Sequence, residues 1–77
     1  MSRLPVISGR MLVKILERLN FAFIRQRGSH IIVRRTTPPH VTVAIPDHKE
    51  LRAGTLRGIL RDVGMKVDDL NDHLSNL

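Results

Sequence analysis

With 77 residues, the chain is long enough for one domain and lies near the lower limit at which an apolar core alone stabilises a fold. It has no cysteine, which excludes disulfides and zinc sites built from thiolates. Its longest wholly apolar run covers residues 21–24 and is too short for a signal-peptide core or a membrane span. We therefore expect a single domain over residues 1–77 that is soluble, cytoplasmic and independent of membranes.

The formal net charge of +6 is unevenly distributed along the chain. Residues 1–35 contain eight basic residues and one acidic residue, whereas residues 36–77 contain five basic residues and six acidic ones. A basic half of this kind attracts a polyanion such as RNA through counterion release, or an acidic protein. The same charge is also compatible with a surface that only keeps the protein soluble.

The only aromatic residues, Phe21 and Phe23, follow the first predicted helix, and we expect both to belong to the core. RNA-binding modules that splay out bases stack them on aromatic side chains. The composition therefore argues against an RNA-recognition motif or an OB-fold.

A helix is predicted from Ser8, a favoured N-cap residue, to about Leu19. Apolar residues recur within it at the i, i+3, i+4 and i+7 spacing of one buried helix face. This stripe consists of Leu12, Ile15, Leu16 and Leu19.

Three short strands are predicted next, over residues 22–27, 30–35 and 41–45. Gly28 and Ser29 separate the first two strands. A two-residue loop of this kind is typical of a β-hairpin in which glycine takes the positive φ of a type II′ turn. The apolar residues of the third strand that share one face are Val41, Val43 and Ile45.

Two helices are predicted in the C-terminal half. The first covers residues 53–63 and ends at Gly64, a favoured residue type after a helix. The second is short and has Asp68 and Asp69 in its first turn, where carboxylates suit the helix dipole. The apolar stripes are Leu56, Ile59, Leu60 and Val63 in the first and Val67, Leu70, Leu74 and Leu77 in the second. The order α-β-β-β-α plus a short C-terminal helix predicts an α+β domain, with helices on one face of a three-stranded antiparallel sheet.

The predicted hairpin places Arg27 directly across from His30, and directly opposite residues project to the same face of a sheet. Continued along the strands, this register pairs Gln26 with Ile31, Arg25 with Ile32, Ile24 with Val33 and Phe23 with Arg34. The residues expected on the core face are Ile24, Ile31 and Val33. Those expected on the other face are Arg25, Arg27, His30 and Arg34.

An imidazole among guanidinium groups is suited to chemistry on a phosphodiester. Arginine binds phosphate bidentately and stabilises the extra charge of a pentacoordinate phosphorus. Histidine is the side chain whose unperturbed pKa suits proton transfer near neutral pH. The alternative is that His30 is an ordinary solvated residue on an exposed strand.

The sequence gives less reason to assign a catalytic role to the other histidines. His40 follows two prolines in a loop, and His73 is expected on the polar surface of the last helix. His48 lies in the loop after the third strand, where it is either a structural hydrogen-bonding residue or part of the site. No pair of histidines has the helical spacing of a metal site, so we expect no metal, cofactor or small-molecule ligand.

Three segments of the chain resemble proteins of the HicA family, in the same order and at the same spacing. They are Leu4-Pro5-Val6-Ile7-Ser8-Gly9, Gln26-Arg27-Gly28-Ser29-His30, and Gly54-Thr55-Leu56-Arg57-Gly58-Ile59-Leu60-Arg61 with Gly64 closing the helix. The chain departs from the family pattern at two helix starts. Arg10 or Met11 replaces an acidic residue in the first helix, and Lys66 replaces a capping serine or threonine in the last.

The resemblance implies a double-stranded-RNA-binding-domain-like fold, in agreement with the predicted element order. It also implies that His30 is catalytic, and that Pro46 and His48 match the proline and histidine after the family's third strand. As the resemblance further implies, the chain is then an mRNA-cleaving toxin of a type II toxin–antitoxin system. A HicB-type antitoxin protein, which we expect to be acidic, inhibits it.

Together with the resemblance, the sequence predicts an endoribonuclease that cleaves mRNA without a metal ion, with His30 as its catalytic residue. The residues expected to bind RNA are Arg25, Arg27, Ser29, Arg34 and His48. Two alternatives remain open. One is a non-catalytic RNA-binding module of the same fold, and the other is a protein-interaction module whose basic face binds an acidic partner.

Overall fold

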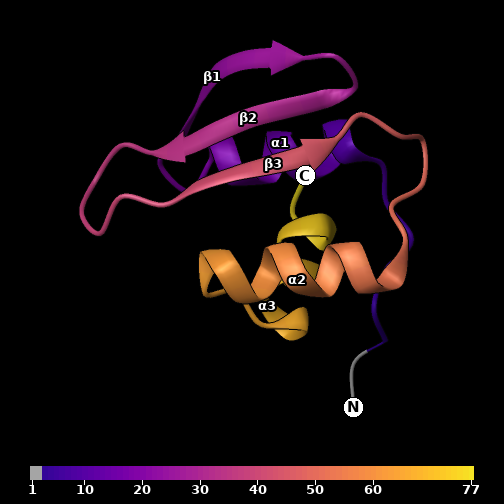
Figure 1. Cartoon of the computed structure of the whole chain (residues 1–77). Coiled ribbons are helices and arrows are strands. Elements are labelled where there is room, and N and C mark those ends of the chain that lie inside the picture. The colour runs from indigo at the N-terminus through magenta and orange to yellow at the C-terminus, as the bar shows by residue number, and fades with distance from the viewer. Residues whose placement is uncertain (1–2) are drawn as a thin grey trace.

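The computed structural model describes residues 3–77. Its helices and strands occur in the order α-β-β-β-α-α (Figure 1). The elements are α1 (Gly9–Glu17), β1 (Phe21–Arg27), β2 (His30–Arg35), β3 (Thr42–Pro46), α2 (Ala53–Val63) and α3 (Val67–Ser75). The strands form one antiparallel sheet in the order β1-β2-β3. In Figure 1, α1 lies behind this sheet and α2 and α3 lie below it. The predicted α+β class and element order are confirmed.

The helices and one face of the sheet enclose the hydrophobic core. α1 packs against β1 and β3, and α2 packs against β3. Alternate residues of β2 and β3 point into this layer, because successive strand side chains project to opposite faces. The buried apolar residues are Ile7, Leu12, Ile15, Leu16, Phe21, Ile31, Val33, Val43, Ile45, Leu51, Leu56, Ile59, Leu60, Val63 and Leu70. Within residues 3–77 no polar or charged residue is buried, so apolar contact stabilises this core.

α1 begins where predicted, because the Ser8 side chain accepts a hydrogen bond from the Met11 amide at 3.0 Å. The first three residues of the predicted stripe are fully buried, whereas Leu19 is half-buried and lies beyond the helix. α1 ends at Glu17, before the predicted end at Leu19. Asn20 has a left-handed φ of 70°, which asparagine tolerates better than most residues, and this conformation turns the chain into β1.

The β1–β2 hairpin has the predicted turn and, next to it, the predicted register. Gly28 has a φ of 59° whereas Ser29 does not have a positive φ, which is the pattern of a type II′ turn. The pairs confirmed here are Arg27 with His30, Gln26 with Ile31 and Arg25 with Ile32.

Beyond Arg25 the predicted register is wrong, because β1 contains a β-bulge at Ile24. The pairing passes from Arg25 opposite Ile32 to Phe23 opposite Val33, and Ile24 is left without an opposite residue. An extra residue in one strand has this effect. Ile24 is therefore 52% exposed and does not belong to the core, contrary to the prediction.

The prediction that Phe23 belongs to the core is also wrong. Phe21 is buried as expected, but Phe23 is 52% exposed on the edge strand of the sheet. Ala22, rather than Phe23, lies opposite Arg34. Every residue of β1 from Phe23 onward is exposed, so the helical layer shields only the beginning of this strand.

β3 begins and ends one residue later than predicted. Val43 and Ile45 are buried as expected, whereas Val41 lies before the strand and is half-buried. Pro46 ends this edge strand, a position where the missing proline N–H is tolerated. α2 has the predicted bounds, and Gly64 ends it with a left-handed φ of 75°.

α3 is shorter than its predicted apolar stripe. It ends at Ser75, so Leu77 lies beyond the helix and is 52% exposed instead of packing with the stripe. At its start, the Lys66 amide donates to the Asp69 carboxylate at 3.2 Å, so a first-turn acid caps the helix where a capping hydroxyl is absent. None of the helices within residues 3–77 is long and apolar enough to span a membrane.

Candidate active site

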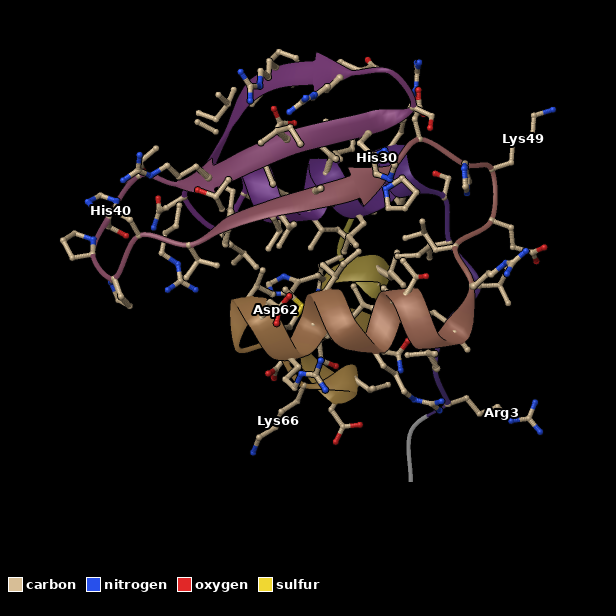
Figure 2. All side chains as sticks on the ribbon, in the orientation of Figure 1. Arg3, His30, His40, Lys49, Asp62 and Lys66 are labelled. Atoms are coloured by element: carbon tan, nitrogen blue, oxygen red, sulfur yellow. The ribbon has the colours of Figure 1, made fainter. Side chains whose placement is uncertain are left out.

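His30 is the first residue of the central strand β2 and is exposed on the face of the sheet that the helices leave open. The strand alternates, so Ile31 and Val33 are buried while His30 and Arg34 are exposed. Figure 2 shows His30 beside the end of β3, and His40 at the opposite end of the sheet. The predicted position of His30 outside the core face is confirmed. We call this open side the outer face of the sheet.

The strand register groups two of the three predicted RNA-binding arginines with His30. Arg27 lies directly opposite His30, and such pairs have Cβ atoms about 4.5–5.5 Å apart. Arg25 lies opposite Ile32, which makes it a diagonal neighbour of His30 at about 7–8 Å. Arg34 lies farther along β2, about 13 Å from His30 at the usual rise of a strand. The structure therefore brings Arg25 and Arg27 to His30 and leaves Arg34 at the other end of the outer face.

The charged side chains of the sheet are all positive. The three strands contain four arginines and no aspartate or glutamate. The acidic residues other than Glu17 lie in the β3–α2 loop, in α2 and in α3. The nearest to the strands is Asp47, which directly follows β3 and accepts a hydrogen bond from Gln26 of β1. An anion that approaches His30 on this face therefore meets guanidinium groups and no competing carboxylate on the strands.

Ser29 is joined through its backbone to Asp47, the residue before His48, but the side chains of Ser29 and His48 do not line the same hollow. The Ser29 carbonyl accepts a hydrogen bond from the Asp47 amide at 2.6 Å, and the His48 carbonyl accepts one from the Gly9 amide at 2.9 Å. The His48 side chain lines a hollow of about 390 Å³ whose other lining residues are Ser8, Arg10, Asp47 and Lys49. His30 is not among these lining residues, so His48 belongs to a neighbouring part of the surface.

Asp47 is the best-connected side chain near the hairpin turn, and no local pattern in the sequence distinguishes it. Its carboxylate accepts hydrogen bonds from Arg10 Nε at 2.9 Å and Arg10 Nη2 at 3.1 Å. Gln26 Nε2 donates to the same carboxylate at 3.2 Å and to the Gly28 carbonyl at 3.3 Å. The hydrogen bond from Arg10 is the main reason that the pKa of Asp47 lies below its ordinary value.

Gly9 allows the start of α1 to lie directly on the end of β3. A Cβ atom at this position would come within 1.9 Å of the Pro46 carbonyl oxygen, so only glycine fits. The hydrogen bond from the Gly9 amide to His48 joins the same two segments. The only sign of this contact in the sequence was that Gly9 belongs to the first segment that resembles the HicA family.

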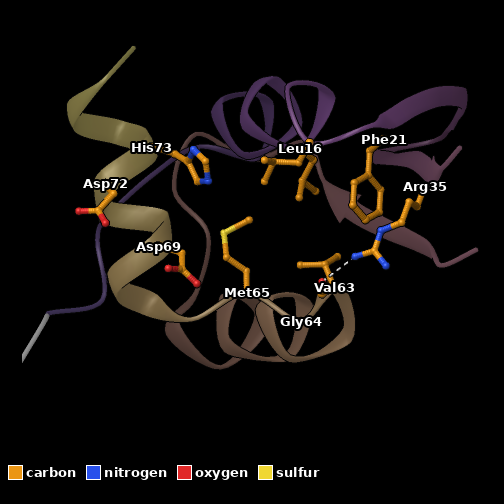
Figure 3. A pocket seen from close by; sticks show the side chains of 10 residues that line it. Leu16, Phe21, Arg35, Val63, Gly64, Met65, Asp69, Asp72 and His73 are labelled. Carbon is orange, nitrogen blue, oxygen red and sulfur yellow. Dashed lines mark hydrogen bonds between the residues drawn. The ribbon is translucent and has the colours of Figure 1, made fainter. Parts of the chain in front are cut away.

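Arg35, the fourth strand arginine, serves the fold rather than the outer face. Its Nη2 donates to the Val63 carbonyl at 3.0 Å near the end of α2, and its guanidinium lies 5.2 Å from the ring centroid of Phe21 (Figure 3). These residues border a hollow of about 470 Å³. Its lining residues are Leu16, Leu19, Phe21, Arg35, Val63, Gly64, Met65, Asp69, Asp72 and His73.

The two remaining histidines lie away from His30. His73 lines the hollow of Figure 3 and is half-buried, which corrects its predicted place on the polar surface of the last helix. His40 is exposed in the β2–β3 loop as predicted, with its Nδ1 atom 3.0 Å from the Arg35 carbonyl oxygen. No three potential metal-ligating side chains gather within residues 3–77.

The fold and the site define a small α+β domain with a histidine on a cationic, carboxylate-free sheet face. Residues 9–65 of the 77-residue chain match the family model described as HicA toxin of bacterial toxin-antitoxin. The chain therefore belongs to the HicA toxin family of bacterial toxin–antitoxin systems. No curated protein sequence and no solved structure matches it. The resemblance seen in the sequence is confirmed at the level of the family.

Proposed function

We propose that this chain is the ribonuclease toxin of a type II toxin–antitoxin pair, and that His30 is its catalytic residue. The observation that carries the proposal is the pairing of His30 with Arg27 on a carboxylate-free sheet face of a HicA-family protein. A cationic surface selects a polyanion, and a histidine within it supplies the proton transfer that cleavage of a phosphodiester requires.

In the proposed reaction, neutral His30 takes the proton from a ribose 2′-OH, and the oxygen attacks the adjacent phosphorus in line. The bond from phosphorus to the 5′ oxygen breaks. One product then ends in a 2′,3′-cyclic phosphate and the other in a 5′-hydroxyl. We assign the proton that reaches the leaving oxygen to water, because His48 lines a hollow that His30 does not share. No metal ion takes part in this step.

Arg27 and Arg25 hold the phosphate that is attacked, because the strand register makes them the cationic neighbours of His30. Guanidinium groups bind phosphate oxygens bidentately and stabilise the charge that develops on them. Ser29 and Arg34 bind the flanking backbone of the RNA at the two ends of β2, and His48 binds it beside the hairpin turn. An acidic HicB-type antitoxin inhibits the reaction by covering this surface.

The test compares wild type, His30→Ala and His40→Ala on a fluorescent RNA oligonucleotide in the presence of EDTA. His40 is the matched control, because it is an exposed histidine at the opposite end of the sheet. We expect wild type and His40→Ala to cleave the RNA, and His30→Ala to bind it without cleavage. An oligonucleotide with 2′-deoxyribose at the cleaved position should resist all three proteins.

Cleavage by His30→Ala at the wild-type rate would contradict the catalytic role of His30. Wild-type protein that binds RNA without cutting it would instead support a non-catalytic RNA-binding module. In a growing bacterium, induced wild type should stop growth and degrade mRNA, whereas His30→Ala should be folded and tolerated.

A further inference from the structure

Three side chains from different parts of the chain meet at the carboxylate of Asp47. Arg10 belongs to the first turn of α1, Gln26 to β1, and Asp47 to the loop after β3. Arg10 and Asp47 are 37 residues apart in the sequence and form a two-pronged ion pair, while Gln26 reaches both Asp47 and the Gly28 carbonyl. We call Arg10, Gln26 and Asp47 the Asp47 clasp.

The Asp47 clasp is tied to the turn that carries His30. The Asp47 amide donates to the Ser29 carbonyl at 2.6 Å, just past the pairing of His30 with Pro46 at the end of the β2–β3 ladder. Through Gln26, the clasp also contacts the Gly28 carbonyl. Both residues of the two-residue turn are thus attached, one by backbone and one by side chain, to a loop that α1 holds in place.

The exposure of the ion pair indicates that the clasp fixes geometry rather than adding folding stability. The Arg10 side chain is 76% exposed and that of Asp47 is 19% exposed. Ion pairs that reach solvent contribute little to folding stability. A bidentate guanidinium–carboxylate pair nevertheless has a defined geometry, which fixes the relative position of the groups it joins.

We propose that Arg10, Gln26 and Asp47 are positioning residues that hold the Gly28–Ser29 turn, and with it His30, against the end of β3. This inference rests on the proposed function, because it assigns the clasp to the cleavage reaction of His30. Because the His30 side chain is exposed, its position depends on the backbone that carries it. A displacement of about 1 Å of a reacting group lowers a rate by up to a hundredfold.

The experiment compares Arg10→Ala, Asp47→Asn and the double variant with wild type, and uses Lys14→Ala as the matched control. Lys14 is exposed on the same helix and its removal changes the charge as Arg10→Ala does, without touching Asp47. Three quantities are measured. They are thermal unfolding, amide hydrogen exchange at positions 30 and 47, and kcat and KM for RNA cleavage.

We expect each single variant to unfold near the wild-type temperature, to exchange these amides roughly tenfold faster, and to lose roughly tenfold in kcat with little change in KM. The double variant should lose no more than either single variant, because both changes break one contact. Lys14→Ala should behave as wild type. A second variant, Gln26→Ala, should accelerate exchange at the turn while the Arg10–Asp47 pair persists.

Unchanged exchange at the turn in the single variants, or additive losses in the double variant, would overturn the positioning role. Faster exchange with an unchanged kcat would overturn it too, because His30 would then not depend on the clasp. Failure of the proposed function has a different signature, because wild type and Lys14→Ala would then cleave no RNA while the exchange effect persisted.

Discussion

Gly9 is the residue at which the fold and the candidate site meet most closely. It lies directly after the Ser8 cap, is buried, and faces the Pro46 carbonyl at the end of β3. This contact brings the start of α1 against the segment that pairs with His30. Glycine is therefore required at position 9 because any side chain would collide with Pro46, and not because of an unusual backbone φ.

Gly9→Ala should lower the free energy of unfolding by about 1–3 kcal/mol, because a backbone carbonyl cannot yield to the new methyl group as a flexible side chain can. Gly54→Ala is the control. A Cβ at Gly54 meets no heavy atom within 4 Å in α2, so this change should raise stability by about 0.4–1 kcal/mol. Urea unfolding with equal m-values measures both, and a Gly9→Ala protein as stable as wild type would disprove the close contact.

The pKa of Asp47 provides a second test at the scale of one residue. Arg10 hydrogen-bonds the carboxylate and lowers its pKa, so the pair persists at neutral pH and is lost as the pH falls through the folded value. We expect the NMR titration of this carboxyl to have its midpoint below the ordinary aspartate value of about 3.9 in wild type. In Arg10→Ala the midpoint should rise, and in Lys14→Ala it should stay. Equal midpoints in wild type and Arg10→Ala would show that the pair does not form in solution.

Among the elements, β1 shows how an irregularity serves both the core and the outer face. Its two phenylalanines and two arginines are alternate residues, so an unbroken strand would place all four on one face. The bulge at Ile24 shifts the alternation between them. Phe21 can therefore enter the core while Arg25 and Arg27 remain on the outer face beside His30.

The salt dependence of RNA binding tests this assignment of β1. Removing one arginine that binds a phosphate should reduce the slope of log affinity against log salt by about 0.7 for single-stranded RNA. Arg25→Ala and Arg27→Ala should each show this reduction and should also lower kcat. Arg34→Ala should weaken RNA binding with a smaller effect on kcat, because Arg34 lies farther from His30. Arg61→Ala, an exposed arginine on α2, is the control for charge. A triple variant of the outer-face arginines with the wild-type slope would place the RNA elsewhere.

At the scale of the whole molecule, the acidic residues are absent from the strands of the sheet. The charged side chains of the strands are all arginines, whereas residues 47–75 contain six of the seven acidic residues together with five basic ones. A single-sign surface of this kind steers oppositely charged partners and speeds their association. Under the proposed function, the outer face attracts both RNA and an acidic antitoxin, so we expect the two to compete for it.

The proposed antitoxin should cover residues 24–35 rather than act at a distance. We expect hydrogen exchange across these residues to slow in the complex, RNA cleavage to stop, and the association rate to fall markedly with salt. Exchange in α3, which lies away from the outer face, provides the internal control. If residues 24–35 exchanged equally fast in the free and bound toxin, inhibition by direct coverage would be wrong.

Local patterns in the sequence determined most of the secondary structure of this protein. The apolar spacing of α2, the Ser8 cap, the Gly64 terminator and the Gly28–Ser29 turn all act over a few residues, and each is found where it was predicted. α1 was predicted as well, although it ends before Leu19, the last residue of its stripe. The turn also set the first three pairs of the hairpin, because register next to a two-residue loop follows from its length. For this reason the placement of His30 opposite Arg27 could be predicted from the chain alone.

Only the tertiary structure decided which residues meet from distant parts of the chain. The bulge at Ile24 depends on which β1 side chains pack against α1 and the core, so the predicted pairing is wrong beyond Arg25. Asp47 contacts Arg10 and Gln26, which are 37 and 21 residues away in the sequence, and Gly9 contacts Pro46. No short sequence pattern predicts these contacts, because they depend on how the elements pack. Local spacing specifies elements because its forces act within one or two turns of chain, whereas these contacts arise only after the apolar faces of several elements have been buried together.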